Sequence, residues 1–308
     1  MLQTGLFTHR ECSQHEMGSW HPECPERLAA ISDHLISTGI APHLKHYDAP
    51  LASTQALQRA HSADYVERLQ SSVPTKGYLP LDPDTSMNSH SLNAALRAAG
   101  AVVDAADRVA SGEIANAFCA VRPPGHHARR SAAMGFCIFN SIAVGARHAL
   151  DALGFERVVV IDFDVHHGNG TEEIFADDEK VLMASFFQHP FYPYSGTGNL
   201  AKNMVNVPLP AGTKGDVARR VVDEVWLPRL NEFEPQMIFI SAGFDAHRED
   251  DLGQMGLVEA DYTYITERLM EVANEHASGR IVSSLEGGYN LDALGRSVVA
   301  HVKALARL

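Results

Sequence analysis

Short runs of apolar residues, many of them β-branched, alternate along the chain with longer segments in which apolar positions recur every three to four residues. The apolar runs predict strands over residues 4–7, 117–121, 158–162, 181–185, 237–241 and 281–284. Most of these runs are continuous rather than alternating, which is typical of a parallel sheet covered on both faces.

Helical periodicity fills the segments between these strands. After Pro25, apolar residues recur at Leu28, Ile31 and Leu35, and Gly39 follows as the expected helix end. Further helices are predicted over residues 90–110, 140–153, 216–232, 259–277 and 291–306. This alternation, without repeats or linkers, predicts a single α/β domain over residues 1–308, with a central, mainly parallel sheet flanked by helices on both faces.

Composition narrows the class of protein. The 308 residues include 45% hydrophobic and 20% charged side chains, as expected for a globular protein with a large core. A net charge of −13 without a basic run argues against direct binding to nucleic acid. No apolar stretch reaches 18 residues, and polar residues from Thr8 onwards leave no room for a signal peptide. Because the four cysteines form no CxxC pair, we expect reduced thiols in a cytoplasmic enzyme without membrane contacts.

Polar, glycine-rich segments follow four of the predicted strands. Their sequences are RPPGHH at residues 122–127, DFDVHHGNG at 162–170, AGFDAH at 242–247 and LEGGYN at 285–290. In open α/β sheets the chemistry gathers in the loops at the carboxyl ends of the strands. We therefore expect all four segments to lie at one edge of the sheet.

The second of these segments has metal-ligand spacing. Asp162, Asp164 and His166 are two residues apart, so they project to one side of an extended chain, and Asp245 offers a further ligand from another strand end. One imidazole and two carboxylates leave coordination positions open, as in a catalytic rather than a structural zinc site. Iron or cobalt would also suit these ligands. Taken alone, the segment is also compatible with a strand end that carries solvated acids.

A base and an oxyanion donor are also available. Two carboxylate ligands cancel the charge of the ion, so the ion acidifies its bound water less and a separate protein base is needed. His126 and His127 are the candidates for this base. Asp162 and Asn169 offer one charged and one neutral partner, which would separate the two imidazole pKa values. Tyr289 can donate its phenolic hydrogen to an oxyanion, although Gly-Gly-Tyr alone is more often a simple turn.

Together these motifs resemble the zinc-dependent histone deacetylase family, which includes acetylpolyamine amidohydrolases and has the arginase/deacetylase fold. The resemblance rests on RPPGHHA at residues 122–128, GFC at 135–137, DFDVHHGNGT at 162–171, GFDAH at 243–247 and EGGYN at 286–290. It extends from residue 4 through residues 21–28 to the last predicted helix. Asn169 and the Phe-Asp-Ala-His sequence resemble the class II branch, in a bacterial-type member.

The resemblance implies removal of acetyl or other acyl groups from lysine side chains by metal-activated water. Asp164, His166 and Asp245 are the implied zinc ligands. His127 is the implied general base and then acid, and His126 is the paired imidazole, hydrogen-bonded to Asp162. Tyr289 would polarise the acyl carbonyl. One implied potassium site comprises Asp162, Asp164, His166, Ser185 and Phe186, and a second comprises Phe175, Asp178 and Val181. Phe136 and Tyr194 are the implied aromatic walls of the substrate channel, and Arg27 is implied to lie beside an acetate channel. The other implied substrate contacts are Leu252, Asp84, Gly135 and Gly287.

The substrate remains open between acyl-lysine and smaller acylated amines. Leu252 stands where polyamine-selective relatives carry a glutamate, and an apolar residue there favours acyl-lysine. Acetylpolyamine stays an alternative because the net charge of −13 would attract a polycation. Phe187 replaces a usual histidine and Asp251 a usual proline, which leaves the acyl preference open. A non-catalytic acyl-lysine reader is a third hypothesis, and an arginase-like dimanganese hydrolase is disfavoured by the single ligand set.

Overall fold

A parallel sheet forms the centre of the structure. The computed structural model describes residues 2–308, within which eight strands follow the order β2-β1-β5-β10-β9-β6-β7-β8, all neighbours parallel. The strands are β1 (Thr4–Thr8), β2 (Lys45–Asp48), β5 (Asn116–Cys119), β6 (Val158–Asp162), β7 (Val181–Gln188), β8 (Met204–Leu209), β9 (Met237–Ala242) and β10 (Ile281–Leu285). A separate antiparallel pair consists of β3 (Leu79–Pro80) and β4 (Ser86–Met87).

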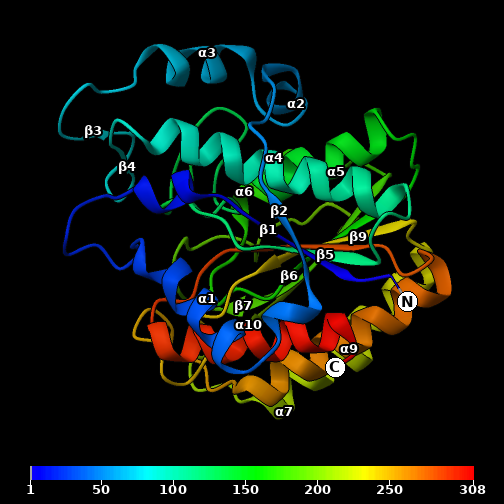
Figure 1. Cartoon of the computed structure of the whole chain (residues 1–308). Helices are drawn as coiled ribbons and strands as arrows, with labels where there is room; N and C mark the ends of the chain where they lie inside the picture. The colour runs from blue at the N-terminus through cyan, green and yellow to red at the C-terminus, as the bar shows by residue number, and fades with distance from the viewer. Residues whose placement is uncertain (1) are drawn as a thin grey trace.

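Helices cover both faces of this sheet (Figure 1). One face carries α4 (Ser91–Ala110) and α5 (Ser141–Asp151), with α2 (Thr54–Gln58) and α3 (Ala63–Ser71) outside them. The other face carries α1 (Glu26–Ser37), α9 (Glu259–His276) and α10 (Leu291–Ala306), and α10 contacts both of the others. The remaining helical segments are α6 (Asn169–Phe175), α7 (Gly215–Val221), a π-helical turn (Val222–Trp226), α8 (Leu227–Phe233) and two 3-10 turns (Arg10–Gln14 and Ala41–His43).

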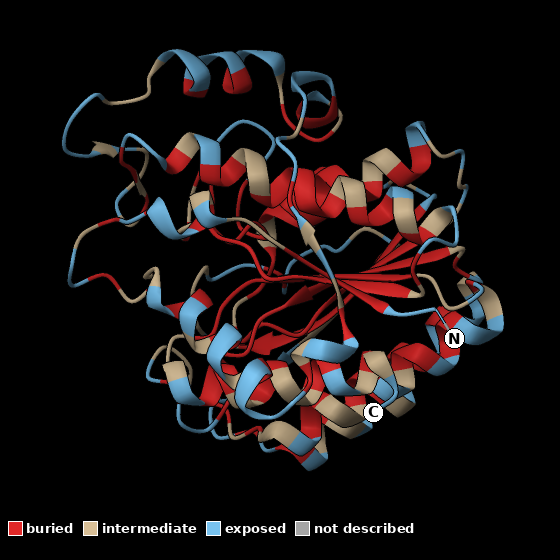
Figure 2. Ribbon diagram, in the orientation of Figure 1, coloured by how far each residue is buried: buried red, intermediate tan, exposed pale blue. Residues whose placement is uncertain are grey.

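The core lies on both faces of the sheet. Figure 2 shows buried residues along the central strands and on the helix surfaces that face them. Every residue of β5, β6, β7, β9 and β10 is buried, which explains why these strands read as continuous apolar runs. Helix α4 packs with small side chains such as Ala95, Ala98, Ala99 and Val102. None of the helices in residues 2–308 combines the length and hydrophobicity that crossing a membrane requires.

The structure confirms the predicted fold class, and its differences from the predicted elements are local. The six predicted strands correspond to β1, β5, β6, β7, β9 and β10, whereas the edge strands β2 and β8 were not predicted. Both edge strands are partly exposed, and β8 contains Pro208, so neither has a continuous apolar run. The helix predicted over residues 216–232 is divided by the π-helical turn into α7 and α8. Helices α2 and α3 were not predicted either.

The strand order brings the four polar segments to one edge of the sheet. Strands β5, β10, β9 and β6 are consecutive neighbours and all run in the same direction, so their carboxyl ends lie side by side. Asp162, the last residue of β6, pairs in register with Ser241 of β9 and with Ser185 of β7. The loops that follow these strands therefore meet at this edge, as expected for the functional site of an open α/β sheet.

Candidate active site

Three potential metal ligands converge at the carboxyl edge of the sheet. Asp164 and His166 lie in the loop after β6, and Asp245 lies in the loop after the neighbouring strand β9. One ligand atom from each of the three lies within 4.8 Å of the other two. His166 Nδ1 is 3.0 Å from Asp164 Oδ1 and 3.1 Å from Asp245 Oδ2. Both carboxylates are fully buried, so only a cation or a shared proton can offset their repulsion.

The electrostatics of this cluster favour a bound cation. Burial, and then the charge of Asp164, raise the pKa of Asp245 to about 7. Burial opposes ionisation of Asp164 as well, but the charges of His126 and His166 outweigh it and hold the pKa of Asp164 below its usual value. Burial alone would lower the pKa of His166, but hydrogen bonds to the two carboxylates raise it to about 10. The chain's own charges thus attract positive charge to the point where the three side chains meet.

Backbone N–H groups fix the orientation of both carboxylates. Val165 N–H donates to Asp245 Oδ1 at 2.9 Å, and Gly287 N–H donates to Asp164 Oδ2 at 2.9 Å. A Cβ at position 287 would lie 2.0 Å from Asp245 Oδ2, so only glycine fits there. Gly287 was predicted to contact substrate, but the structure places it against these two carboxylates, because the β10 loop passes directly behind them.

Two imidazoles with different partners lie beside the cluster. His126 Nδ1 donates to Asp162 Oδ2 at 2.9 Å, and His127 Nδ1 donates to Asn169 Oδ1 at 2.8 Å. The two rings are 4.0 Å apart. Burial alone would lower the pKa of His126, but the charges of Asp162 and Asp164 hold it well above the usual value. Burial and then the charge of His126 hold the pKa of His127 well below the usual value. One imidazole is therefore suited to remain protonated and the other to accept a proton.

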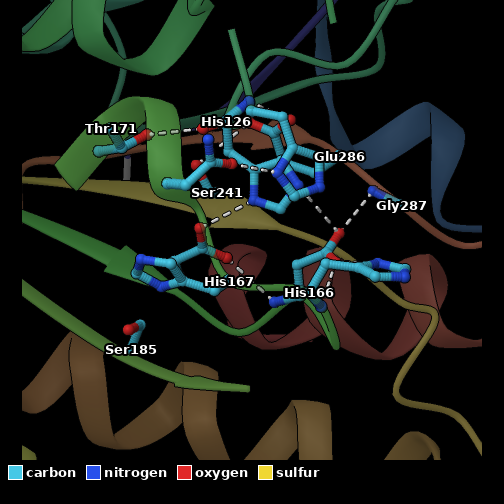
Figure 3. A network of polar contacts seen from close by, with 12 residues as sticks. His126, His166, His167, Thr171, Ser185, Ser241, Glu286 and Gly287 are labelled. Carbon is cyan, nitrogen blue, oxygen red and sulfur yellow. Dashed lines mark hydrogen bonds and ion pairs between the residues drawn. The ribbon is translucent and has the colours of Figure 1, made fainter. Parts of the chain in front are cut away.

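A buried glutamate that sequence reasoning missed supports this pair. Glu286 accepts hydrogen bonds from the backbone N–H groups of Gly125 at 2.6 Å and His126 at 3.0 Å, and from the Ser241 hydroxyl at 3.1 Å. Figure 3 shows Glu286, Ser241 and Gly287 around His126. Burial raises the pKa of Glu286 to about 7. The available signal in the sequence was an acidic residue directly after the predicted strand over residues 281–284 and Leu285.

A cavity of about 240 Å³ opens onto the cluster. Its lining residues are Asp84, His127, Gly135, Phe136, His166, Phe191, Tyr192, Asp251, Leu252 and Tyr289. The Phe136 and Tyr289 rings meet edge to face at 5.9 Å, and Phe191 stacks on His166 at 5.3 Å. The structure thus brings most of the predicted substrate-contacting residues to one cavity.

The prediction that Tyr194 forms an aromatic wall is wrong. Its side chain is 74% exposed, whereas Phe191 and Tyr192 line the cavity in its place. The reason is a tight turn in which Tyr194 N–H donates to the Phe191 carbonyl at 2.7 Å, and Tyr194 has a left-handed φ of 59°. The turn leaves Phe191 and Tyr192 against His166 and His127 and directs Tyr194 to solvent.

The other predicted substrate residues lie at the rim or the wall. Asp84 Oδ1 accepts hydrogen bonds from Gly135 N–H at 2.9 Å and from the Thr85 hydroxyl at 2.8 Å, so it supports the loop that carries Phe136. Gly135 has a φ of 57°, and a Cβ there would lie 2.4 Å from the His127 ring. Leu252 is half-buried in the cavity wall.

Arg27 lies deeper, outside the cavity lining. Its buried guanidinium donates to Glu23 Oε1 at 3.0 Å and to the Gly288 carbonyl at 2.7 Å, and it packs 5.0 Å from the centre of the Tyr289 ring. Burial raises the pKa of Tyr289 well above its usual value, so the phenol stays protonated. Arg27 thereby connects α1 to the loop that carries Tyr289.

The residues assigned by resemblance to the first monovalent cation include two members of the cluster, Asp164 and His166, together with Asp162, Ser185 and Phe186. Asp162 and Ser185 pair in register, and Phe186 follows Ser185 on β7. Figure 3 shows Ser185 below the loop that carries His166. Within residues 2–308, the carbonyls of Asp164 and His166 accept no hydrogen bond. Loop carbonyls without a donor, beside a buried carboxylate, are suitable ligands for a hard cation.

Comparison with known proteins gives a consistent result. Residues 21–305 match the family described as Histone deacetylase domain. A probable deacetylase of Archaeoglobus fulgidus is 38% identical over 299 residues, covering 94% of this chain and 82% of that protein. A histone deacetylase-like amidohydrolase of Pseudomonas aeruginosa is 37% identical over 277 residues, covering 88% and 73%. The crystal structure of the HDA15 HD domain superimposes with a TM-score of 0.94 at 35% identity, covering 99% of this chain and 88% of that one.

Proposed function

Because this chain belongs to the histone deacetylase family, we propose that it hydrolyses acyl-lysine amides at one zinc ion held by Asp164, His166 and Asp245. Deacetylase chemistry on such amides follows from the family itself. The observation that carries the zinc proposal is the meeting of three ligand atoms within 4.8 Å at a cavity that His127 and Tyr289 also line. Residues 1–308 act as one catalytic domain in this proposal.

The donor set fits a catalytic zinc site. One imidazole and two carboxylates are ligands that zinc accepts, and they leave coordination positions free. Zinc bound there would act as a Lewis acid that lowers the pKa of a water molecule and polarises the acyl carbonyl. The same mixed nitrogen and oxygen ligands would also accept iron(II) or cobalt(II).

His127 is the proposed general base. Since Asn169 Oδ1 accepts from Nδ1 of His127, that nitrogen carries the proton of the neutral ring and leaves Nε2 free to accept one. The lowered pKa of His127 keeps the ring neutral at physiological pH. Nε2 then takes a proton from the attacking water, and the same proton passes to the leaving lysine amine as the amide C–N bond breaks. The carboxylic acid formed by this step gives its proton to the released amine, so the products are a carboxylate and an alkylammonium ion, and His127 returns to its neutral form.

His126 and Tyr289 have separate roles in this proposal. The ion pair with Asp162 keeps His126 protonated, and its charge keeps His127 from being protonated before substrate arrives. The phenol of Tyr289 donates a hydrogen bond to the oxyanion that forms on the acyl carbonyl. Arg27, packed on the ring, positions this phenol and lies at the proposed exit for acetate.

The cavity suits an acyl-lysine side chain. Phe136, Tyr192 and Leu252 offer apolar walls to the methylene chain of the lysine, and Asp84 stands at the rim. The second candidate substrate class, acetylpolyamine, is favoured by the exposed Asp251 carboxylate, which also lines the cavity and can meet a free ammonium group of the polyamine. A potassium ion at Asp162, Asp164, His166, Ser185 and Phe186 is proposed as a structural cofactor. The free cysteines fit a cytoplasmic location.

The test compares turnover of a fluorogenic acetyl-lysine peptide and of acetylputrescine by purified protein. Chelation should abolish both activities, and addition of one equivalent of zinc per chain should restore them. Asp245→Ala should lose metal and activity, whereas Asp33→Ala, at an exposed position of α1, should lose neither. Activity that survives both chelation and Asp245→Ala would refute the zinc proposal, and a preference for acetylputrescine would replace acyl-lysine by the second class.

A further inference from the structure

Three backbone carbonyls converge on the side chain of Asn203. Asn203 Nδ2 donates to the carbonyl oxygens of Phe175 at 2.8 Å, Asp178 at 3.1 Å and Val181 at 2.9 Å. Phe175 ends α6, Val181 begins β7, and Asn203 directly precedes β8. These three carbonyls belong to the residues that the family resemblance assigns to a second monovalent cation.

The orientation of the Asn203 amide is determined by a fourth contact. Asn203 Oδ1 accepts a hydrogen bond from Asp177 N–H at 3.1 Å. Rotating the amide by half a turn would place its oxygen against three carbonyl oxygens and its NH2 group against the N–H of Asp177. All four contacts would become repulsive, so the nitrogen is the atom that faces the carbonyls.

The amide nitrogen already occupies a position at which the three carbonyl oxygens could coordinate a cation. An ion coordinated by the three oxygens must lie close to all of them, and Nδ2 already lies within 3.1 Å of each. The distances are those of ordinary N–H···O hydrogen bonds, and the two amide hydrogens supply the positive charge that the carbonyl dipoles face.

A second positive group lies next to the same turn. The Arg147 guanidinium packs 4.8 Å from the centre of the Phe175 ring, pairs with the Asp178 carboxylate and donates to the Ile174 carbonyl at 3.2 Å. The Asp178 side chain is therefore neutralised by Arg147 and adds no attraction for a further cation. Both observations disagree with a monovalent ion at this position.

We propose that the Asn203 carboxamide takes the place of the second monovalent cation in this chain. It ties the end of α6 and the start of β7 to β8 by hydrogen bonds instead of by an ion. Helix α6 begins at Asn169, the partner of His127, so this connection stabilises the support of the candidate base without a salt requirement. The inference concerns the fold of this chain and holds whether or not zinc and acyl-lysine are correct.

Crystals of the protein soaked in a thallium(I) or rubidium salt test the proposal directly, because these ions scatter anomalously. In the wild type, we expect no anomalous peak within coordination distance of the Phe175, Asp178 and Val181 carbonyls. A peak there would overturn the proposal. In Asn203→Ala, which removes the amide, we expect a peak at the position vacated by Nδ2.

A measurement in solution covers the case in which the variant does not crystallise. The Tm of wild type, Asn203→Ala and the surface control Asn231→Ala is compared in potassium chloride and in N-methylglucamine chloride at equal ionic strength. Potassium chloride should raise the Tm of Asn203→Ala by about 3 °C or more beyond the rise that it causes in the other two proteins. The reason is that only this variant exposes a carbonyl site that binds an ion. Equal potassium effects in all three proteins would contradict the proposal.

Discussion

Asn169 Oδ1 accepts a hydrogen bond from His127 Nδ1 at 2.8 Å, so a neutral amide orients the imidazole that lines the cavity. The adjacent His126 has a carboxylate partner instead, Asp162, at 2.9 Å. Because their partners differ in charge, the two imidazoles differ in protonation state: His126 is protonated and His127 is neutral. Burial and the charge of His126 hold the pKa of His127 well below its usual value, and the amide of Asn169 does not oppose them with a negative charge.

Replacing this amide by a carboxylate should shift the pH dependence of hydrolysis. In Asn169→Asp, the negative charge stabilises protonated His127 and raises its pKa. Because the base acts in its neutral form, the acidic limb of the kcat/KM profile should move to higher pH, by about 1 pH unit. Steady-state kinetics from pH 5 to 9 measure the shift, with Asn231→Asp on the surface as control. An unmoved acidic limb would exclude His127 as the titrating base.

Removing the Tyr289 hydroxyl should slow the reaction without unfolding the protein. Tyr289→Phe retains the ring against Arg27 and Phe136 but removes the hydrogen-bond donor proposed for the oxyanion. One such donor is typically worth 10²–10³ in kcat, so a loss of about that size is expected. The exposed Tyr78→Phe serves as control for loss of a phenol elsewhere. Unchanged kcat in Tyr289→Phe would remove this phenol from the mechanism.

The Asp251 carboxylate should discriminate between substrates by charge. It is exposed and lines the cavity beside Leu252, where it can attract the free ammonium group at the far end of acetylputrescine. Asp251→Asn should therefore lower kcat/KM for acetylputrescine by about 3- to 10-fold, the effect of about 1 kcal/mol of exposed charge pairing, and leave a neutral acetyl-lysine peptide unaffected. Asp64→Asn on α3 is the matched control. Equal losses on both substrates would show that Asp251 does not read substrate charge.

The parts of this structure that could be predicted from sequence are those with local signals. Continuous apolar runs identified the buried strands, and the spacing of two residues between Asp162, Asp164 and His166 placed three polar groups together at one strand end. The direction of parallel strands then placed Asp245 near them. Each of these inferences needs only the pattern within one element and the geometry of the sheet.

The parts that could not be predicted depend on contacts between distant segments. The role of Glu286 depends on the N–H groups of Gly125 and His126, which come from a segment about 160 residues earlier in the chain and reach it only through folding. The Tyr194 prediction failed because a left-handed residue in a tight turn reverses which aromatic side chain faces the cavity. The Asn203 contacts join the end of α6, the start of β7 and the residue before β8. The pattern of apolar and polar residues within each segment does not indicate that these segments meet.

The stability of the protein should fall between pH 6.5 and pH 4, in part through His61. Burial lowers the pKa of His61 to about 4, and both ring nitrogens are already engaged: Nδ1 donates to the Arg129 carbonyl at 3.0 Å, and Nε2 accepts from Asn140 N–H at 2.9 Å. A proton on Nε2 would face that N–H, so the folded protein resists protonation. The unfolded chain accepts the proton below pH 6.5, and its greater proton binding makes stability decrease as the pH falls through this interval.

Urea unfolding at pH 7 and pH 5 measures this contribution. A histidine with so low a pKa in the folded state should account for a loss of about 2 kcal/mol between these pH values, because each pKa unit corresponds to about 1.4 kcal/mol. His61→Gln should be less stable than wild type at pH 7, because the substitution alters a buried side chain whose two ring nitrogens are both hydrogen-bonded. Since glutamine cannot titrate, the variant should lose about 2 kcal/mol less stability than wild type on acidification. His43→Gln, at an exposed position, should keep the wild-type dependence. If His61→Gln loses as much stability as wild type between pH 7 and pH 5, the neutral buried form of His61 is not a source of acid sensitivity.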